Sequence, residues 1–454
     1  MPSSSKVDLL IKGDLVLSDR VAANTYVGVC SGSIVGIYTE ESLPEAKEFI
    51  DATGKIVFPG VVDAHVHSYS NLQERFEHST AAAAAGGVTT IIEMPYDSCG
   101  PVFDTNAYTE KQKWIADEAK VDVALLSTIK KQGDLESVDA LVELGTCGFK
   151  LSAFETCPER FPRIDDNVLW DILPTLAKTD LPVGFHAEND IIIEALIARY
   201  KAEGMTYPKA HCETRPPISE TLAVSKLLEF AYWTKFSLHI YHSSHPRCLD
   251  MIDWYRDQGV DVSVETCPHY LLLSEDDMPE KKAFAKINPP MRSQEAVSGL
   301  WQGLFDGRID WIASDHAPWP LERKSNEAIF NNGSGAPGVE SMLPLMFSEA
   351  VVKRDMDIVK LGQLLALKPA TRFKLSHRKG SIAVGKDADF AIIDPNHEWY
   401  FDASVTQSSA KWSPYEGKKV TGKVTQTILR GKTIYADDVV LAKAGDGQYV
   451  AAQK

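Results

Sequence analysis

The sequence predicts an α/β protein: a (β/α)8 barrel of the TIM type, joined to a small β-sandwich that the two ends of the chain build together. Three observations lead to this prediction. Apolar strand patterns alternate with helical patterns through residues 58–379. Eight such strands can be counted there, and eight alternating units favour a closed parallel barrel. Residues 1–57 and 380–454 instead show strand and turn patterns without helices.

In the first segment, residues 7–13 and 32–37 alternate apolar and polar side chains between turn residues. Strands with one buried face have this pattern. No helical pattern interrupts them. We therefore expect residues 1–57 to form the first part of the sandwich, outside the barrel.

The barrel is expected to begin with the segment 57–67, an apolar run that predicts a buried strand ending in His65 and His67. Side chains alternate faces along a strand, so these two imidazoles should point the same way. Seven helix and strand pairs then follow along the chain. The expected pairs are helix 76–85 with strand 88–94, 109–119 with 121–126, 137–144 with 148–151, 168–178 with 182–186, 218–234 with 236–242, 248–258 with 260–265, and 296–305 with 309–315.

Strand patterns return after the barrel. Residues 380–394 predict a turn-rich pair of strands, and residues 423–435 predict a hairpin. Each terminal segment is too thin to bury an apolar face by itself. The simplest arrangement therefore packs 1–57 and 380–454 together as one sandwich.

The composition excludes several classes of protein. The chain has 454 residues, 44% hydrophobic and 24% charged, which is typical of a globular protein with a large core. Its formal net charge of -16 argues against a nucleic-acid partner, which would need a basic face. No stretch of about 18 uncharged apolar residues predicts a membrane span, and the N-terminus lacks a secretory core. Seven irregularly spaced cysteines indicate reduced thiols, so we expect a cytoplasmic protein.

Six polar side chains fall at or near the ends of predicted barrel strands, where barrel enzymes carry their reactive groups. Taken singly, each has a simpler interpretation: a hydrogen-bonded histidine, a surface lysine, or an aspartate that caps a helix. Their coincidence at one end of the barrel favours a shared site. The six are His65, His67, Lys150, His186, His242 and Asp315.

The chemistry of this set indicates a metal centre. Histidine nitrogen and aspartate oxygen suit zinc, manganese or iron better than magnesium. Lys150 is normally a cation, with a pKa near ~10.4, but a buried lysine can lose its proton. With carbon dioxide it would become a carbamate that can bridge two metals. A hydroxide shared by the two metals would then attack at neutral pH, and Asp315 would carry its proton to the leaving nitrogen.

Other histidines are expected to have structural roles. His239 and His242 have opposite parity on one strand, and His242 is nearer its carboxyl end, so we choose His242 as the ligand. His239 is then a buried structural histidine and His245 a loop residue. His316 follows Asp315 and should face away, where it can form a supporting hydrogen bond.

At this point the sequence resembles a known family. Segments throughout the chain are similar to the cyclic amidohydrolases, the branch of the amidohydrolase superfamily that contains hydantoinases, allantoinases, dihydropyrimidinases and dihydroorotases. The segments that carry the resemblance are 59–67, 148–150, 186–189, 242–244, 265–271, 288–292, 314–318 and 387–390.

The resemblance implies a carboxylated Lys150 that bridges two divalent metals, usually zinc, with manganese as an alternative. It assigns His65, His67 and Asp315 to one metal, and His186 and His242 to the other. It implies hydrolysis of a cyclic amide in a small ureide or imide ring. It also implies a homodimer or a homotetramer.

Differences between branches of the family favour five-membered cyclic ureides of the hydantoin or allantoin type. Dihydroorotases have an arginine where this chain has Tyr69, and an asparagine where it has Tyr96. Dihydropyrimidinases and D-type hydantoinases have a tyrosine where it has Glu155. The segments 75–95 and 413–422 look closest to allantoinases and L-type hydantoinases. The alternatives are a dihydropyrimidinase or dihydroorotase activity on a six-membered ring, and a non-catalytic scaffold related to dihydropyrimidinase.

Three further residues are candidates for substrate contacts. Asn288 would hold the ring amide, although it could simply form a turn before two prolines. The backbone at Gly335 would line the ring pocket, unless the loop 335–340 is a plain connection. Cys267 would lie near the site, with a packing role as the alternative.

Overall fold

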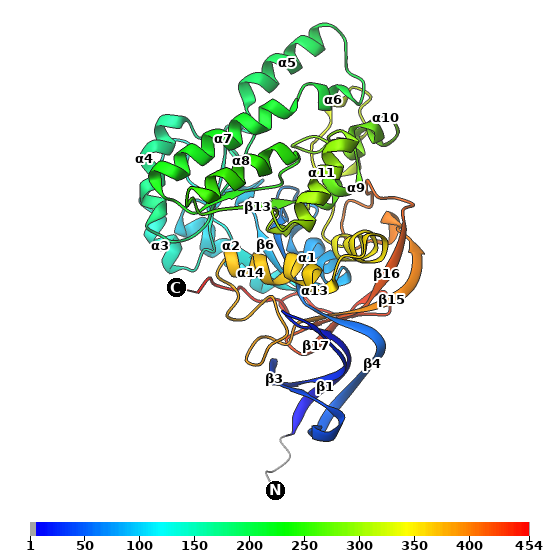
Figure 1. The fold of residues 1–454 in the computed structure, drawn as a ribbon. Coiled ribbons are helices and arrows are strands. Elements are labelled where there is room, and N and C mark those ends of the chain that lie inside the picture. Colours follow the sequence, from blue (N-terminus) through cyan, green and yellow to red (C-terminus); the bar gives the residue numbers. More distant parts are fainter. Residues whose placement is uncertain (1–5, 454) are drawn as a thin grey trace.

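The structure is a computed structural model and describes residues 6–453. Figure 1 shows a part of the molecule in which helices lie outside strands and, below it, a long curved sheet. The sheet holds strands from both ends of the chain, coloured blue and orange to red. No helix within residues 6–453 is both long enough and apolar enough to cross a membrane.

The terminal segments form one eight-stranded sheet in the order β18-β17-β16-β15-β4-β1-β2-β3. The antiparallel pairing of β4 with β15 joins the two segments, with Phe390 opposite Pro59. A separate apolar core lies on this sheet and includes Ile11, Val57 and Ile428. The strands are β1 (Val7–Val16), β2 (Val21–Cys30), β3 (Ser33–Tyr38), β4 (Ala46–Pro59), β15 (Phe390–Tyr400), β16 (Lys419–Leu429), β17 (Lys432–Ala436) and β18 (Val439–Val440).

Two details of the sheet bear on the sequence prediction. The hairpin expected at 423–435 is present as β16 and β17. The prediction of a strand pair at 380–394 is wrong for its first half, because residues 381–389 form turns and one isolated bridge. Gly380 and Gly385 both have positive φ values, which ends extended structure there.

Eight parallel strands form the barrel, and the prediction of a (β/α)8 fold is confirmed. Parallel bridges from Ser127 to Phe149 and from Val66 to His316 join the two barrel sheets into a ring. The strands are β5 (Val61–Val66), β6 (Val88–Glu93), β9 (Asp122–Leu125), β10 (Phe149–Ser152), β11 (Val183–His186), β12 (Leu238–Ile240), β13 (Val262–Thr266) and β14 (Trp311–Ile312).

Helices follow the strands around the outside of the ring (Figure 1). The seven expected helices are α1 (Arg75–Ala85), α2 (Thr105–Glu118), α3 (Val138–Glu143), α4 (Asp166–Ala177), α7 (Pro217–Thr234), α8 (Pro246–Asp257) and α11 (Gln294–Phe305). Shorter elements are β7 (Tyr96–Asp97), β8 (Gly100–Pro101), α9 (Pro268–Leu272), α10 (Met278–Lys281), α12 (Met342–Met346), α13 (Ile358–Gly362) and α14 (Lys368–Arg372).

The sequence prediction missed α5 (Asp190–Ala202) and α6 (Ala210–Glu213), which lie between β11 and α7. Of its thirteen residues, α5 buries only Asp190 and Ile193. A helix that buries so little needs no apolar stripe, so the sequence carries no periodic signal for it. Figure 1 shows α5 at the end of the molecule farthest from the terminal sheet.

The segment 57–67, predicted as one strand, is two strands in the structure. β4 ends at Pro59 within the terminal sheet, and β5 begins at Val61 within the barrel. Gly60 connects them and donates its N–H to Asp389 O at 2.9 Å. A side chain on Gly60 would collide with Thr89 and Asp389, so this close approach of barrel and sheet requires glycine.

A buried ion cluster fastens the barrel to the terminal sheet. Lys379 Nζ lies 2.5 Å from Asp122, at the start of β9, 2.7 Å from Asp389 and 2.8 Å from Asp387. Arg430 also pairs with Asp122. Burial would lower the pKa of Lys379, but the carboxylates around it raise that pKa above its usual value. The ammonium group thus occupies the centre of three carboxylates that would otherwise repel one another.

We expect Lys379→Met to destabilise the protein by about 3–5 kcal/mol, because it leaves buried carboxylates without a counter-charge. The free energy of unfolding in urea measures this directly. Lys47→Met is the matched control, because Lys47 pairs with Asp8 on the surface, where the two side chains are 63% and 40% exposed. Its urea midpoint should stay at the wild-type value, and equal midpoints for the two variants would contradict the proposed role of the cluster.

Candidate metal centre

All six side chains singled out by the sequence line one cavity at the carboxyl ends of the barrel strands. The cavity has a volume of about 830 Å³. His65 and His67 lie at the end of β5, Lys150 in β10 and His186 at the end of β11, and Asp315 follows β14. His242 follows β12 and completes the set. The expected convergence of these residues is therefore present.

Three of the six form a compact group. His65 Nε2 lies 3.2 Å from His67 Nε2 and 3.2 Å from Asp315 Oδ1, and His67 Nε2 lies 3.4 Å from the same oxygen. Ligand atoms at about 2.1 Å from a tetrahedral zinc are about 3.4 Å apart. The spacing and the donor types therefore fit one divalent metal ion at His65, His67 and Asp315.

The second pair of histidines faces the same cavity. His186 Nδ1 lies 2.9 Å from His242 Nε2, and His242 Nδ1 is buried without a hydrogen-bond partner among the described residues. His242 and Asp315 have φ values of 39° and 47°, in the left-handed region that side chains rarely adopt. Such strained backbone persists where the surroundings impose it, often at functional sites.

Burial controls the charge of these groups. It lowers the pKa of His65, His67 and His242 below the usual value for histidine, and the cationic form of Lys150 lowers those of His65 and His242 further. The imidazoles are therefore neutral near pH 7. A neutral imidazole has the free lone pair that a metal ligand needs.

Lys150 is 1% exposed, and its Nζ lies 3.4 Å from the centre of the Tyr241 ring. Burial lowers the pKa of Lys150 to about 7, against the opposing effect of Glu265 and Asp315. A large fraction of the amine is then unprotonated at neutral pH, and only the unprotonated amine can react with carbon dioxide.

Two buried carboxylates orient the histidines, and sequence reasoning did not assign a role to either. Glu265, at the end region of β13, lies 2.6 Å from His65 Nδ1 and accepts a hydrogen bond from Trp311 Nε1 at 2.8 Å. Glu188 lies 2.9 Å from His186 Nε2 and 2.6 Å from the guanidinium of Arg215.

The pKa values of the two carboxylates differ because their surroundings differ. Burial raises the pKa of Glu265 well above its usual value. Burial acts in the same sense on Glu188, but Arg215 and His186 outweigh it and hold that pKa at about 2. The sequence could have indicated a role for Glu265, because this residue lies at the end of a predicted strand. Arg215 lies in a connection between elements, where no sequence pattern marks it.

His239, His245 and His316, the three histidines that the sequence placed outside the metal centre, each contact other protein groups. His239 is fully buried, stacks on Trp311 and lies 3.0 Å from Ser263 Oγ. His245 precedes α8 and accepts a hydrogen bond from Arg247 N. His316 Nε2 lies 3.1 Å from Glu74 Oε1.

The three candidate substrate contacts differ in their surroundings. Asn288 lines the cavity, and its Oδ1 is buried without a partner among the described residues, so it is available to a ligand. Gly335 also lines the cavity, but its N–H already donates to Lys286 O and its carbonyl accepts from Lys324. Cys267 is fully buried and is not among the described residues that line the cavity.

Comparison with known proteins gives consistent matches over the whole chain. The model of the amidohydrolase family matches residues 56–434. An allantoinase from Enterococcus faecalis is 34% identical over 98% of this chain and 99% of its own. An allantoinase from Escherichia coli is 35% identical over 98% of each chain.

Solved structures of hydantoinases also match the chain over nearly its full length. The structure of an L-hydantoinase (dihydropyrimidinase) from Arthrobacter aurescens has a TM-score of 0.94 and 34% identity, and the match covers 98% of this chain and 100% of that one. A structure of D-hydantoinase has a TM-score of 0.91 and 30% identity, over 99% of each chain.

We expect Glu265→Gln to weaken metal binding by about 10–100-fold, because an amide no longer supports the His65 imidazole as a buried carboxylate does. Chelator competition followed by metal analysis measures this. Glu229→Gln is the matched control, because Glu229 also accepts a hydrogen bond from a tryptophan, Trp233, but does so on the outer helix α7. Unchanged metal affinity in Glu265→Gln would contradict the assigned role.

Proposed function

The chain belongs to the amidohydrolase family, in the allantoinase and hydantoinase branch of enzymes that hydrolyse cyclic amides, and we propose that it opens the ring of five-membered cyclic ureides. The observation that carries this proposal is the meeting of six potential metal ligands on one cavity of about 830 Å³. Such a cavity can enclose a hydantoin ring together with a substituent.

The proposed centre holds two divalent metals, either zinc or manganese. His65, His67 and Asp315 would hold one, His186 and His242 the other, and a carboxylated Lys150 would bridge them. The spacing of the first three donor atoms and the lowered pKa of Lys150, about 7, support this assignment. Metals bound there would acidify water and polarise the amide carbonyl.

Two side chains of the site would transfer the proton and bind the substrate ring. Asp315 accepts the proton from the attacking water and delivers it to the ring nitrogen as the carbon–nitrogen bond breaks. Its Oδ1 lies 3.2 Å from His65 Nε2, among the proposed metal ligands, and this position supports the proposed role. The Asn288 side chain would bind the ring amide, since its Oδ1 is free to accept an N–H. The product is an open-chain ureido acid.

Two positions set this chain apart from the dihydropyrimidinases and the dihydroorotases, the two branches that act on six-membered rings. The place held by a tyrosine in dihydropyrimidinases is Glu155, which pairs with Lys131 at 2.5 Å. A carboxylate cannot donate a hydrogen bond to a developing oxyanion. The place held by an arginine in dihydroorotases is Tyr69, whose hydroxyl donates to Glu118 at 2.8 Å and whose ring stacks on Trp114.

We expect Lys150→Ala and Asp315→Asn each to lower kcat for hydantoin or allantoin by about 10³-fold or more, because each removes a group required for the chemical step. A panel of hydantoin, allantoin, dihydrouracil, dihydroorotate and phthalimide, assayed with each variant, measures both rate and ring preference.

Circular dichroism should show both variants folded, and wild-type protein incubated with ¹³C-labelled bicarbonate should show a carbamate carbon signal that Lys150→Ala lacks. Near-wild-type turnover in either variant would exclude the assigned mechanism. Faster turnover of dihydrouracil than of any five-membered ring would exclude the proposed substrate class.

Removal of metal should abolish hydrolysis, and zinc or manganese should restore it better than magnesium, because imidazole nitrogen favours the transition metals. Dialysis against a chelator, followed by reconstitution with each metal in turn, measures this. Two metal equivalents per chain at full recovery are expected. Full activity in protein shown by analysis to be free of metal would contradict the proposal.

A further inference from the structure

One part of the cavity wall holds an aromatic ring with two positive charges near it. Trp319, Arg160 and Arg323 all line the cavity that contains the proposed metal ligands. The centre of the Trp319 ring system lies 4.0 Å from Cζ of Arg323 and 5.9 Å from Cζ of Arg160. Trp319 is fixed in place because its Nε1 donates to Ser334 O at 2.6 Å.

Neither guanidinium forms an ion pair within the part of the chain that the structure describes. Arg160 is half-buried, and its Nη1 donates only to two neutral oxygens, Ser70 O and Ser98 Oγ, each at 3.3 Å. Burial lowers the pKa of Arg160 and the charge of Arg323 acts in the same sense, whereas Cys157 and Asp97 act against it. Two like charges near one ring repel each other, so an anion between them would be stabilising.

Most other charges of the cavity wall are already balanced. Arg215 pairs with Glu188 at 2.6 Å, and Glu155 pairs with Lys131 at 2.5 Å. Glu159 is exposed and accepts a contact from the Cys157 thiol rather than from an arginine. The positive charge at Arg160 and Arg323 is therefore available to a ligand.

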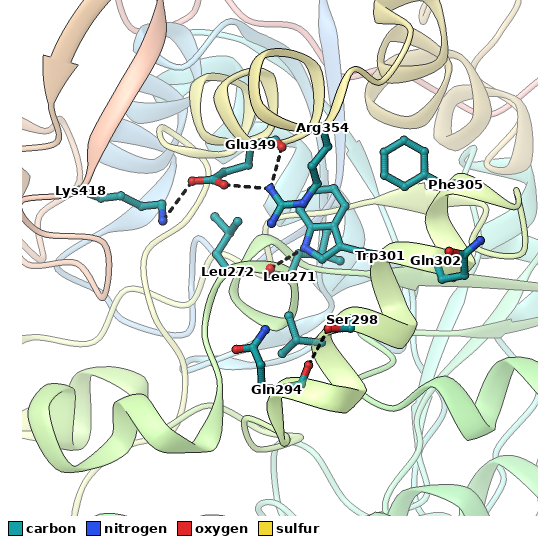
Figure 2. A pocket seen from close by; sticks show the side chains of 11 residues that line it. Leu271, Leu272, Gln294, Ser298, Trp301, Gln302, Phe305, Glu349, Arg354 and Lys418 are labelled. Atoms are coloured by element: carbon teal, nitrogen blue, oxygen red, sulfur yellow. Dashed lines mark hydrogen bonds and ion pairs between the residues drawn. The ribbon is translucent and has the colours of Figure 1, made fainter.

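A second pocket of the protein also has an arginine against a tryptophan ring, and there the charge of the arginine is neutralised by a carboxylate. Figure 2 shows Arg354 against the ring of Trp301, with Cζ 4.1 Å from the ring centre. There Glu349 accepts from Arg354 at 3.0 Å and also pairs with Lys418 at 3.1 Å, as the dashed lines in Figure 2 indicate. Among residues 6–453, no carboxylate pairs with the arginines at Trp319 as Glu349 pairs with Arg354 at Trp301.

We propose that the substrate supplies this missing carboxylate: the enzyme acts on cyclic ureides whose ring substituent carries a carboxylate, and Arg160 and Arg323 bind it. The inference rests on the proposed function, because it describes the substituent of the same ring. A guanidinium binds a carboxylate through two parallel hydrogen bonds, which gives affinity and also fixes orientation. Trp319 provides the apolar surface along which the substituent lies.

The test compares hydantoin-5-propionate with its primary amide, which has the same shape and no charge. Wild-type kcat/KM should be about tenfold or more higher for the acid, mainly through KM, since a hydrogen bond to a charged group contributes on that scale. Arg160→Gln and Arg323→Gln should each lower kcat/KM for the acid by about tenfold. Each should change kcat/KM for the amide by less than about twofold. The preference of the wild type should fall as salt is added.

Arg354→Gln is the matched control, because it removes an arginine from a tryptophan face in the other pocket, and both substrates should keep their wild-type kinetics. Equal kcat/KM for acid and amide in the wild type would overturn the inference and leave the proposed function intact. So would an equal loss for both substrates in the two arginine variants. Failure to open any cyclic ureide would overturn the proposed function, and the inference with it.

Discussion

The pairing of the first and last barrel strands is the interaction on which the site depends. His316 N donates to His65 O at 3.2 Å, and His67 N donates to His316 O at 2.9 Å. Asp63 Oδ1 accepts from Ser314 N at 3.0 Å, although these residues lie 251 positions apart in the chain. This closure brings Asp315 beside His65 and His67. An open sheet would leave the three donor atoms at opposite edges.

Burial then determines what the gathered groups can do. The barrel interior favours uncharged forms, so the pKa values of His65, His67 and His242 fall below the usual value and the Lys150 amine approaches neutrality. The same burial raises the pKa of Glu265 well above its usual value, although Lys150 and hydrogen bonds from Trp311 and from the backbone of His242 act against it. One low-dielectric environment thus prepares nitrogen ligands and a reactive amine together.

The terminal sheet contributes to the site as well as to stability. The connection between β15 and β16 carries Ser408 and Ser409, and both donate hydrogen bonds to Glu74 Oε2. The other oxygen of Glu74 bonds to His316, the residue after Asp315. A carboxylate between sheet and barrel therefore supports the loop that carries the proposed proton carrier.

The sequence by itself determined the barrel, the sheet built from both termini and the six cavity-lining donors, because hydrophobic periodicity and strand-end position are local properties of the chain. It did not determine α5, which buries too little surface to be periodic, or the break at Gly60, which depends on the approach of Asp389. Only the tertiary structure decided that Glu265 and Glu188 orient the histidines and that Arg160 and Arg323 lie near Trp319 without an ion-pair partner among the described residues. These contacts join residues from separate loops and strands, and their energies depend on distances that only the folded chain fixes.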